Sequence, residues 1–278
     1  MIFQLSEEHL MIQKAARDFA QNELKPGVIE RDEKQIFPAE QIKKLGELGF
    51  LGMMVDPKYG GSGLDAISYV IAMEELSKVD ASASVVVSVN NSLVCYGIEA
   101  YGNEEQKQKY LKPLAQGKKD GELYIGAFML SEPEAGSDAT SQRTTAEDKG
   151  DYYLLNGTKN WITNGGNASV YLVIAQTDPA KGSRGINCLI VEKNWPGVVV
   201  AAKENPVEWF KKYPNRFKLC HVKDQTKTAT GIESCHLGKG AIDFKTILAT
   251  AKKQGLQYYI VEQEAFSGST PIESAAID

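Results

Sequence analysis

The sequence predicts a multi-domain α+β protein in three regions. These are an all-α domain over residues 1–120, an antiparallel β domain over 121–204 and a strand–helix–strand (βαβ) unit over 205–278. The first region has apolar residues at helical spacing, whereas the second has short apolar segments separated by turn residues. In the third region, a helical segment lies between a pair of nearly all-apolar segments, which is the pattern of a parallel sheet.

Helix signals follow one another through the first region. Ser6 can cap a helix that ends near Pro26, and Pro38 suits the first turn of the next helix. Residues 66–78 predict a largely buried helix. Residues 103–117 predict a short solvent-facing helix with acidic side chains in its first turn, where the helix dipole favours them.

Two segments of the first region allow more than one interpretation. Residues 81–102 are β-branched enough for a strand, but their length and small residues favour a tightly packed helix, which we prefer. The glycine-rich stretch 56–65 invites comparison with phosphate-binding loops. It lacks the lysine of such loops and follows no clear strand, so a plain tight turn is favoured.

The second region contains short apolar segments separated by turns such as Asn156-Gly157. The segments are residues 123–130, 151–159, 170–177, 186–193 and 196–201. This spacing is typical of an antiparallel sheet.

In the third region, residues 216–224 read as a buried strand, and Asp243 caps a helix that Gly255 ends. Residues 257–264 predict a second strand. These three elements form the predicted βαβ unit.

Composition limits the function classes. The chain of 278 residues has a net charge of −5 and a pI of about 5.4, which predicts no nucleic-acid partner. Its four cysteines show no metal-ligand spacing and suit a reducing compartment. We see neither a signal peptide nor an apolar run of membrane-spanning length, so we expect a cytoplasmic protein without a membrane partner.

Two loops of the second region carry candidate chemistry. Residues 129–141 combine hydroxyls, acids and glycine, and residues 156–166 place Trp161 and Thr163 between two turns. Backbone N–H groups beside hydroxyls suit the polar edge of a flat heterocycle, and an indole can form a wall beside it. From the residues alone, each stretch also reads as an ordinary loop.

Together, the two loops resemble those of the acyl-CoA dehydrogenase family. Residues 130–138 (LSEPEAGSD) fit the family's first signature, although Met129 departs at its first position. Residues 156–166 (NGTKNWITNGG) match the family's second flavin-contacting segment, a hairpin. The resemblance covers residues 1–204 and is closest to short-chain, butyryl-CoA-type members.

The resemblance implies FAD, a short-chain acyl-CoA substrate, electron-transferring flavoprotein as the acceptor and a homo-oligomer. Thr163 would approach the flavin N5 edge, and Ser137 would hold the CoA thioester. The implied flavin contacts are Phe128, Leu130, Ser131, Trp161, Ile162 and Thr163. The product would be a trans-2-enoyl-CoA.

The family's catalytic base is a glutamate of a C-terminal domain that we do not find in this sequence. We therefore assign no catalytic residue, expect a truncated β domain and expect an inactive chain. Glu132 and Glu134 are interpreted as structural. A non-catalytic flavin- or acyl-CoA-binding module is an alternative.

Residues 205–278 resemble the last two βα units of the xylose-isomerase-like sugar phosphate isomerases and epimerases, which are TIM barrels. In that family residues placed like His221 and Glu262 join a divalent-metal site, but the other ligands come from earlier strands, so we expect no metal here. A metal-dependent isomerase fragment is a further alternative. The two resemblances meet at residues 203–206, and we interpret the chain as a chimera.

Overall fold

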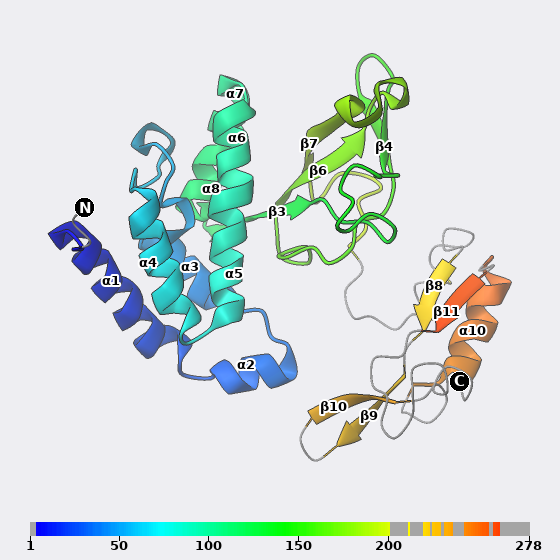
Figure 1. Ribbon diagram of the computed structural model, residues 1–278, viewed down its shortest axis with the longest axis horizontal. Coiled ribbons are helices and arrows are strands. Elements are labelled where there is room, and N and C mark those ends of the chain that lie inside the picture. The colour runs from blue at the N-terminus through cyan, green and yellow to red at the C-terminus, as the bar shows by residue number, and fades with distance from the viewer. Residues whose placement is uncertain are drawn as a thin grey trace. The chain divides into compact units, whose positions relative to one another are not determined.

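The computed structural model describes residues 4–200, 211, 219–222, 224–228, 231–235, 242–255 and 258–261. They fall into two compact units that divide between Val200 and Ala201. Within the first unit, helices precede a five-stranded sheet (Figure 1).

The helical part of the first unit runs from Glu7 to Gln116. Its elements are α1 (Glu7–Phe19), η1 (Ala20–Leu24), α2 (Val28–Lys34), α3 (Ala39–Glu47), η2 (Phe50–Gly52), η3 (Pro57–Tyr59), α4 (Ala66–Ser77), α5 (Ala81–Ser88), η4 (Val89–Cys95), α6 (Tyr96–Tyr101), α7 (Glu104–Gln106), η5 (Lys107–Leu111) and α8 (Lys112–Gln116). The predicted cap Ser6 accepts a hydrogen bond from the His9 backbone, and the Ser6 N–H donates to the His9 ring. The short helix α2 was not predicted.

Residues 81–101 form one continuous helix from α5, η4 and α6, so the preferred helical interpretation is confirmed. Against our expectation, this helix of 21 residues is long and apolar enough to span a membrane, with a mean hydropathy of 1.3 over a window of 18 residues. Half of that window is buried inside the protein, and the side chains of Asn90 and Asn91 donate to backbone carbonyls of a neighbouring element. These contacts are those of a core helix.

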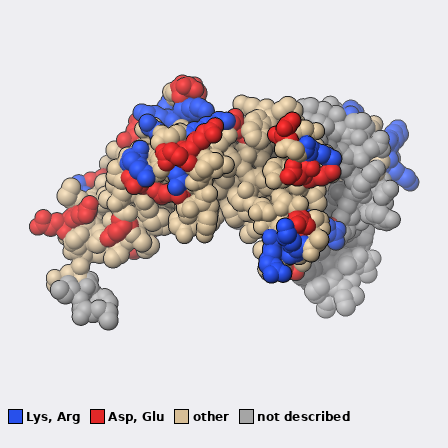
Figure 2. All heavy atoms as spheres, turned by 90° about the horizontal axis from the view of Figure 1, so that it is seen from above, with Lys and Arg blue, Asp and Glu red and all other residues tan. Residues whose placement is uncertain are grey.

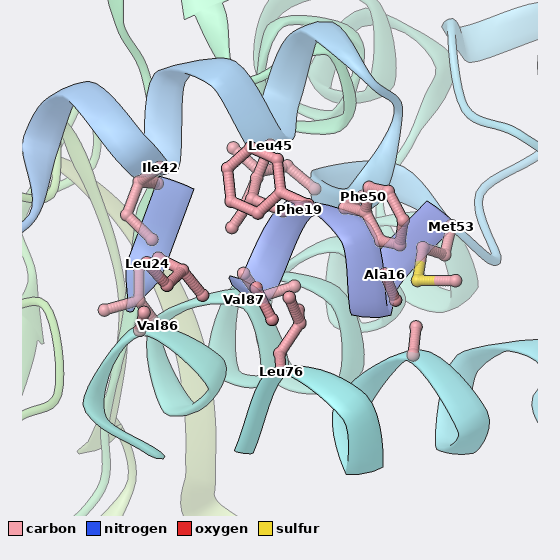
Figure 3. Close-up of a cluster of buried hydrophobic side chains, with 14 of the residues drawn as sticks. Ala16, Phe19, Leu24, Ile42, Leu45, Phe50, Met53, Leu76, Val86 and Val87 are labelled. Carbon is pink, nitrogen blue, oxygen red and sulfur yellow. The ribbon is translucent and has the colours of Figure 1, made fainter. Parts of the chain in front are cut away.

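The main hydrophobic cluster lies where α1, α3, α4 and α5 meet (Figure 3). Phe19 of α1 lies among Leu45 of α3, Leu76 of α4 and Val87 of α5, all of them buried. Apolar residues at helical spacing thus face a common interior, as the sequence pattern predicts. This cluster holds the continuous helix 81–101 in place, and that helix adjoins the sheet.

The sheet of the first unit is mixed, whereas we predicted an antiparallel one. Its strands are β3 (Gly126–Met129), β4 (Thr145–Asp148), β5 (Tyr153–Asn156), β6 (Val170–Gln176) and β7 (Ile186–Glu192), and a separate hairpin joins β1 (Lys118–Lys119) to β2 (Glu122–Leu123). β6 pairs antiparallel with β7 but parallel with β3 and, at one residue, with β4. Parallel pairing needs a long crossover, and residues 130–169 supply it.

Two predicted features of the sheet are wrong, and one strand was not predicted. Residues 196–200 form no strand, and there Val198 and Val200 pack against a buried cluster without strand pairing. The stretch 156–166 is not a hairpin, because β5 ends at Asn156 and a loop continues to β6. The strand β4 was missed because its sequence, TAED, is polar and three of its four residues are exposed.

The second unit contains the predicted βαβ arrangement. Strand β8 (Leu219–Val222) pairs parallel with β11 (Tyr258–Val261), and α10 (Phe244–Lys253), capped by Asp243, lies between them in the chain. The hairpin of β9 (Asp224–Thr228) and β10 (Gly231–Cys235) was not predicted. These elements confirm a βαβ unit, while a TIM-barrel fragment stays a prediction.

Candidate functional site

Two loops meet beside strand β3. One, residues 130–144, follows β3, and the other, residues 157–169, leads into β6. The Asn160 N–H donates to the carbonyl of Ser131 at 2.9 Å, which joins the first halves of the loops. The two stretches that the sequence singled out are therefore neighbours in space.

A buried ion pair lies at this meeting point. Lys159 Nζ is 2.7 Å from Glu132 Oε1, and the two side chains are only 6% and 2% exposed. Glu132 also accepts hydrogen bonds from the backbone N–H groups of Arg143 at 2.6 Å and Thr144 at 3.1 Å. Every oxygen of the carboxylate is thus satisfied inside the protein, as a buried charge requires.

Lys159 reaches the backbone of the first loop as well. Its Nζ donates to the Leu130 carbonyl at 3.0 Å and to the side chain of Gln142 at 2.5 Å. Burial lowers the pKa of Lys159, and Glu132 offsets only part of this effect. Burial opposes the negative charge of Glu132, but the bonds from Lys159 and from the backbone outweigh it and lower the pKa of Glu132.

Trp161 follows this junction directly and extends into solvent. Its side chain is 92% exposed, and its φ of 58° is in the left-handed region that most residues avoid. Three residues later, Asn164 has a φ of 65° and is buried, and it donates to the Gly126 carbonyl at 3.0 Å. The Asn164 Oδ1 atom is buried without a partner among the described residues.

The other residues implied as flavin contacts surround this junction. Leu130, Ser131 and Thr163 are half-buried, and Ile162 packs against the same cluster as β6. Phe128 packs against a cluster that includes helical residues. Their role in binding flavin stays a prediction.

Ser137 lies in the exposed part of the first loop. Its neighbour Asp138 accepts hydrogen bonds from Thr140 and Ser141, which lower the pKa of Asp138 and form a local turn. Glu134 is 3.5 Å from Arg143 in an exposed ion pair. Glu134 and Asp138 therefore interact with other residues of the same loop.

The described residues contain no group of three metal-ligating side chains. His221 lies in β8, and Glu262 lies outside the described residues, so the metal pair stays a prediction. Lys, Arg, Asp and Glu are intermixed over the coloured part of the face in Figure 2.

Several functional neighbours were missed by sequence reasoning. Lys159 is the last residue of the predicted segment 151–159, where a charged residue gives no sign of burial. Asn90 and Asn91 were more visible, because paired amides inside an apolar helix suggest buried hydrogen bonds. Asn90 accepts from the Gly126 N–H at 2.9 Å and so joins the helical part to β3.

Two family profiles match this chain. One is the acyl-CoA dehydrogenase N-terminal domain, over residues 6–118, and the other is the middle domain of the same family, over residues 127–208. Both matches end before residue 209, so the isomerase-like interpretation of the tail stays a prediction.

Known proteins are similar over the same region. A short-chain specific acyl-CoA dehydrogenase of Clostridium acetobutylicum is 45% identical over 73% of this chain and 52% of its own length. The structure of butyryl-CoA dehydrogenase from Megasphaera elsdenii is 43% identical with a TM-score of 0.69, over 74% of this chain and 54% of that one.

A third similar chain comes from a solved structure described as the electron transferring flavoprotein of Acidaminococcus fermentans. It is 47% identical with a TM-score of 0.70, over 74% of this chain and 53% of that one. This chain thus spans about half the length of the proteins that it matches.

Proposed function

The chain belongs to the acyl-CoA dehydrogenase family, whose members are FAD-dependent enzymes, and from that premise we propose that it forms the flavin-edge portion of a short-chain acyl-CoA dehydrogenase. The substrate class would be short-chain acyl-CoA thioesters, and the electron acceptor an electron-transferring flavoprotein. The names of the Clostridium and Megasphaera relatives support a substrate with a short acyl chain, and the name of the Acidaminococcus structure supports the electron acceptor.

The observation that carries this proposal is the junction of the two loops. It presents an indole that is 92% exposed at Trp161, the residue after Asn160, whose N–H donates to the Ser131 carbonyl. A flat apolar face beside polar backbone suits a planar heteroaromatic ring with a polar edge. The residues present therefore fit an isoalloxazine.

Bound FAD would supply the hydride acceptor for oxidation of the thioester to its trans-2-enoyl form. On the protein side, Leu130 and Ser131 would hold the polar edge of the ring, Trp161 would pack against its face, and Ser137 would hold the thioester. Phe128, Ile162 and Thr163 would complete the contact, with Thr163 toward N5.

No described acid near the loops is free to act as the base that removes the α-proton. Glu132 is buried in its pair with Lys159, Glu134 pairs with Arg143, and Asp138 bonds within its own loop. We infer that the base lies outside the described residues, and that residues 4–200 bind the flavin and thioester without turning the substrate over.

Flavin binding to the purified chain tests the proposal. Titration of the apoprotein with FAD, followed by flavin fluorescence, should show saturable binding that Trp161→Ala weakens by at least about tenfold, equivalent to about 1.4 kcal/mol. Trp195→Ala is the matched control, since Trp195 is also exposed, at 45%, but lies in the turn after β7. Equal affinities for all three proteins would contradict the proposed ring position.

Anaerobic addition of butyryl-CoA separates the enzyme from the binding module. A perturbed flavin spectrum without bleaching means binding alone, which is the expected result. Bleaching that butyryl-CoA causes faster than octanoyl-CoA would show a complete short-chain dehydrogenase and refute the inferred inactivity. A chain that binds no flavin would overturn the proposed function itself.

A second candidate concerns the tail, where the parallel pairing of β8 with β11 favours a βαβ unit. We propose that residues 205–278 are a fragment of a sugar phosphate isomerase. Thermal stabilisation by Mn²⁺ or Co²⁺ without bound flavin, abolished by His221→Ala, would support it. A melting temperature that neither metal ion changes would refute this second candidate.

A further inference from the structure

We propose that Lys159 and Glu132 are positioning residues that lock the two loops together and so set the backbone of the flavin edge. The inference rests on the proposed function for its ligand, but the lock itself is a property of the protein alone. It goes beyond the predicted contact residues, because neither side chain would touch the flavin.

The lock acts on two successive carbonyl groups of the first loop. Lys159 Nζ donates to the Leu130 carbonyl at 3.0 Å, and the Asn160 N–H donates to the Ser131 carbonyl at 2.9 Å. Two successive residues of one loop thus hold two successive residues of the other. A shift of either loop would break both bonds.

This arrangement orients the donor that the flavin edge would use. No peptide bond in the described chain is cis, and in a trans peptide the C=O and the following N–H point in opposite directions. With the Leu130 carbonyl turned toward Lys159, the Ser131 N–H points away from it. No acceptor meets that N–H among the described residues.

Glu132 completes the lock by binding the far end of the first loop. It accepts from the backbone N–H groups of Arg143 and Thr144 while it pairs with Lys159. Gln142 adds a bond to the Leu130 carbonyl at 3.1 Å. The carboxylate thereby closes the first loop on itself, and Lys159 ties the closed loop to the second one.

The first test needs no ligand. Hydrogen exchange followed by mass spectrometry should show peptides spanning residues 130–144 and 157–164 losing at least about tenfold in protection in Lys159→Met. Lys149→Met is the matched control, because Lys149 pairs with Glu147 at the surface turn between β4 and β5. Unchanged exchange in Lys159→Met would overturn the lock.

A double variant separates positioning from the cost of an unpaired buried charge. Removing one partner leaves a buried charge, whereas Lys159→Met with Glu132→Gln leaves none. We expect the double variant to regain most of the melting temperature that Lys159→Met loses, while its loops stay unprotected. Full recovery of loop protection would show that the pair only balances charge and would refute positioning.

FAD titration of the same variants reads the consequence at the flavin edge. Both Lys159→Met and the double variant should bind FAD at least about tenfold more weakly than the control, a change that corresponds to about 1.4 kcal/mol. Unchanged FAD affinity with unprotected loops would refute the link to the flavin edge. If the unaltered chain binds no FAD, the proposed function fails, while the exchange result still decides whether the lock exists.

Discussion

Replacing Asn90 by leucine tests how the helical part holds the sheet. Asn90 is completely buried in η4, where its amide meets three backbone groups. Its Nδ2 donates to the carbonyls of Leu51 at 2.8 Å and Leu114 at 3.1 Å, and its Oδ1 accepts from the Gly126 N–H at 2.9 Å. Leucine is of comparable size but can make none of these bonds.

The expected loss follows from these three bonds. A typical hydrogen bond contributes about 1 kcal/mol net, and a buried group left without a partner costs about 1–3 kcal/mol. The three backbone groups belong to buried residues, and burial of the leucine side chain offsets part of the loss. We therefore expect Asn90→Leu to lower the free energy of unfolding by about 3–4 kcal/mol.

Urea denaturation followed by circular dichroism measures this change, with the slope m compared between proteins. Ser92→Ala is the control on the same helix, because the Ser92 hydroxyl bonds only the Ser88 carbonyl one turn earlier, and it should change stability by less than about 0.5 kcal/mol. A loss below about 1 kcal/mol in Asn90→Leu at unchanged m would refute the reasoning.

Two further predictions concern the same core. The hydrogen bond from Arg17 lowers the pKa of the buried Glu75 to about 2, although burial opposes its negative charge. Glu75 therefore stabilises the fold above about pH 4.5, and this contribution is lost as the pH falls toward 2. In Glu75→Gln, the free energy of unfolding should depend less on pH over this acidic range. In Gly126→Ala the new Cβ would lie 2.4 Å from a methyl carbon of Val94, so the free energy of unfolding should fall by about 1–3 kcal/mol. Denaturation of the two single variants and of Gly126→Ala with Val94→Ala should show that the double variant loses less stability than the sum of the two single losses. Strictly additive losses would contradict this close contact.

Local chemistry in the sequence determined where many elements begin and end. Ser6, Asp65 and Asp243 cap helices by bonding backbone N–H groups within three residues, so the signal and the structure lie in the same short stretch. The apolar segments 170–177 and 186–193 became strands because their composition suits a buried sheet wherever they pair. The site loops were visible as a resemblance, and their flavin contacts stay predictions.

Tertiary structure decided what depends on partners distant in the chain. The parallel pairing of β3 with β6 joins residues about 44 positions apart, such as Gly126 and Val170, and no local pattern distinguishes it from antiparallel pairing. Likewise, Glu132 and Lys159 are 27 residues apart, and although Glu132 was interpreted as structural, no local pattern identified Lys159 as its partner. Only the fold removes both from water and brings them together, and this burial turns two loop residues into a lock at the candidate site.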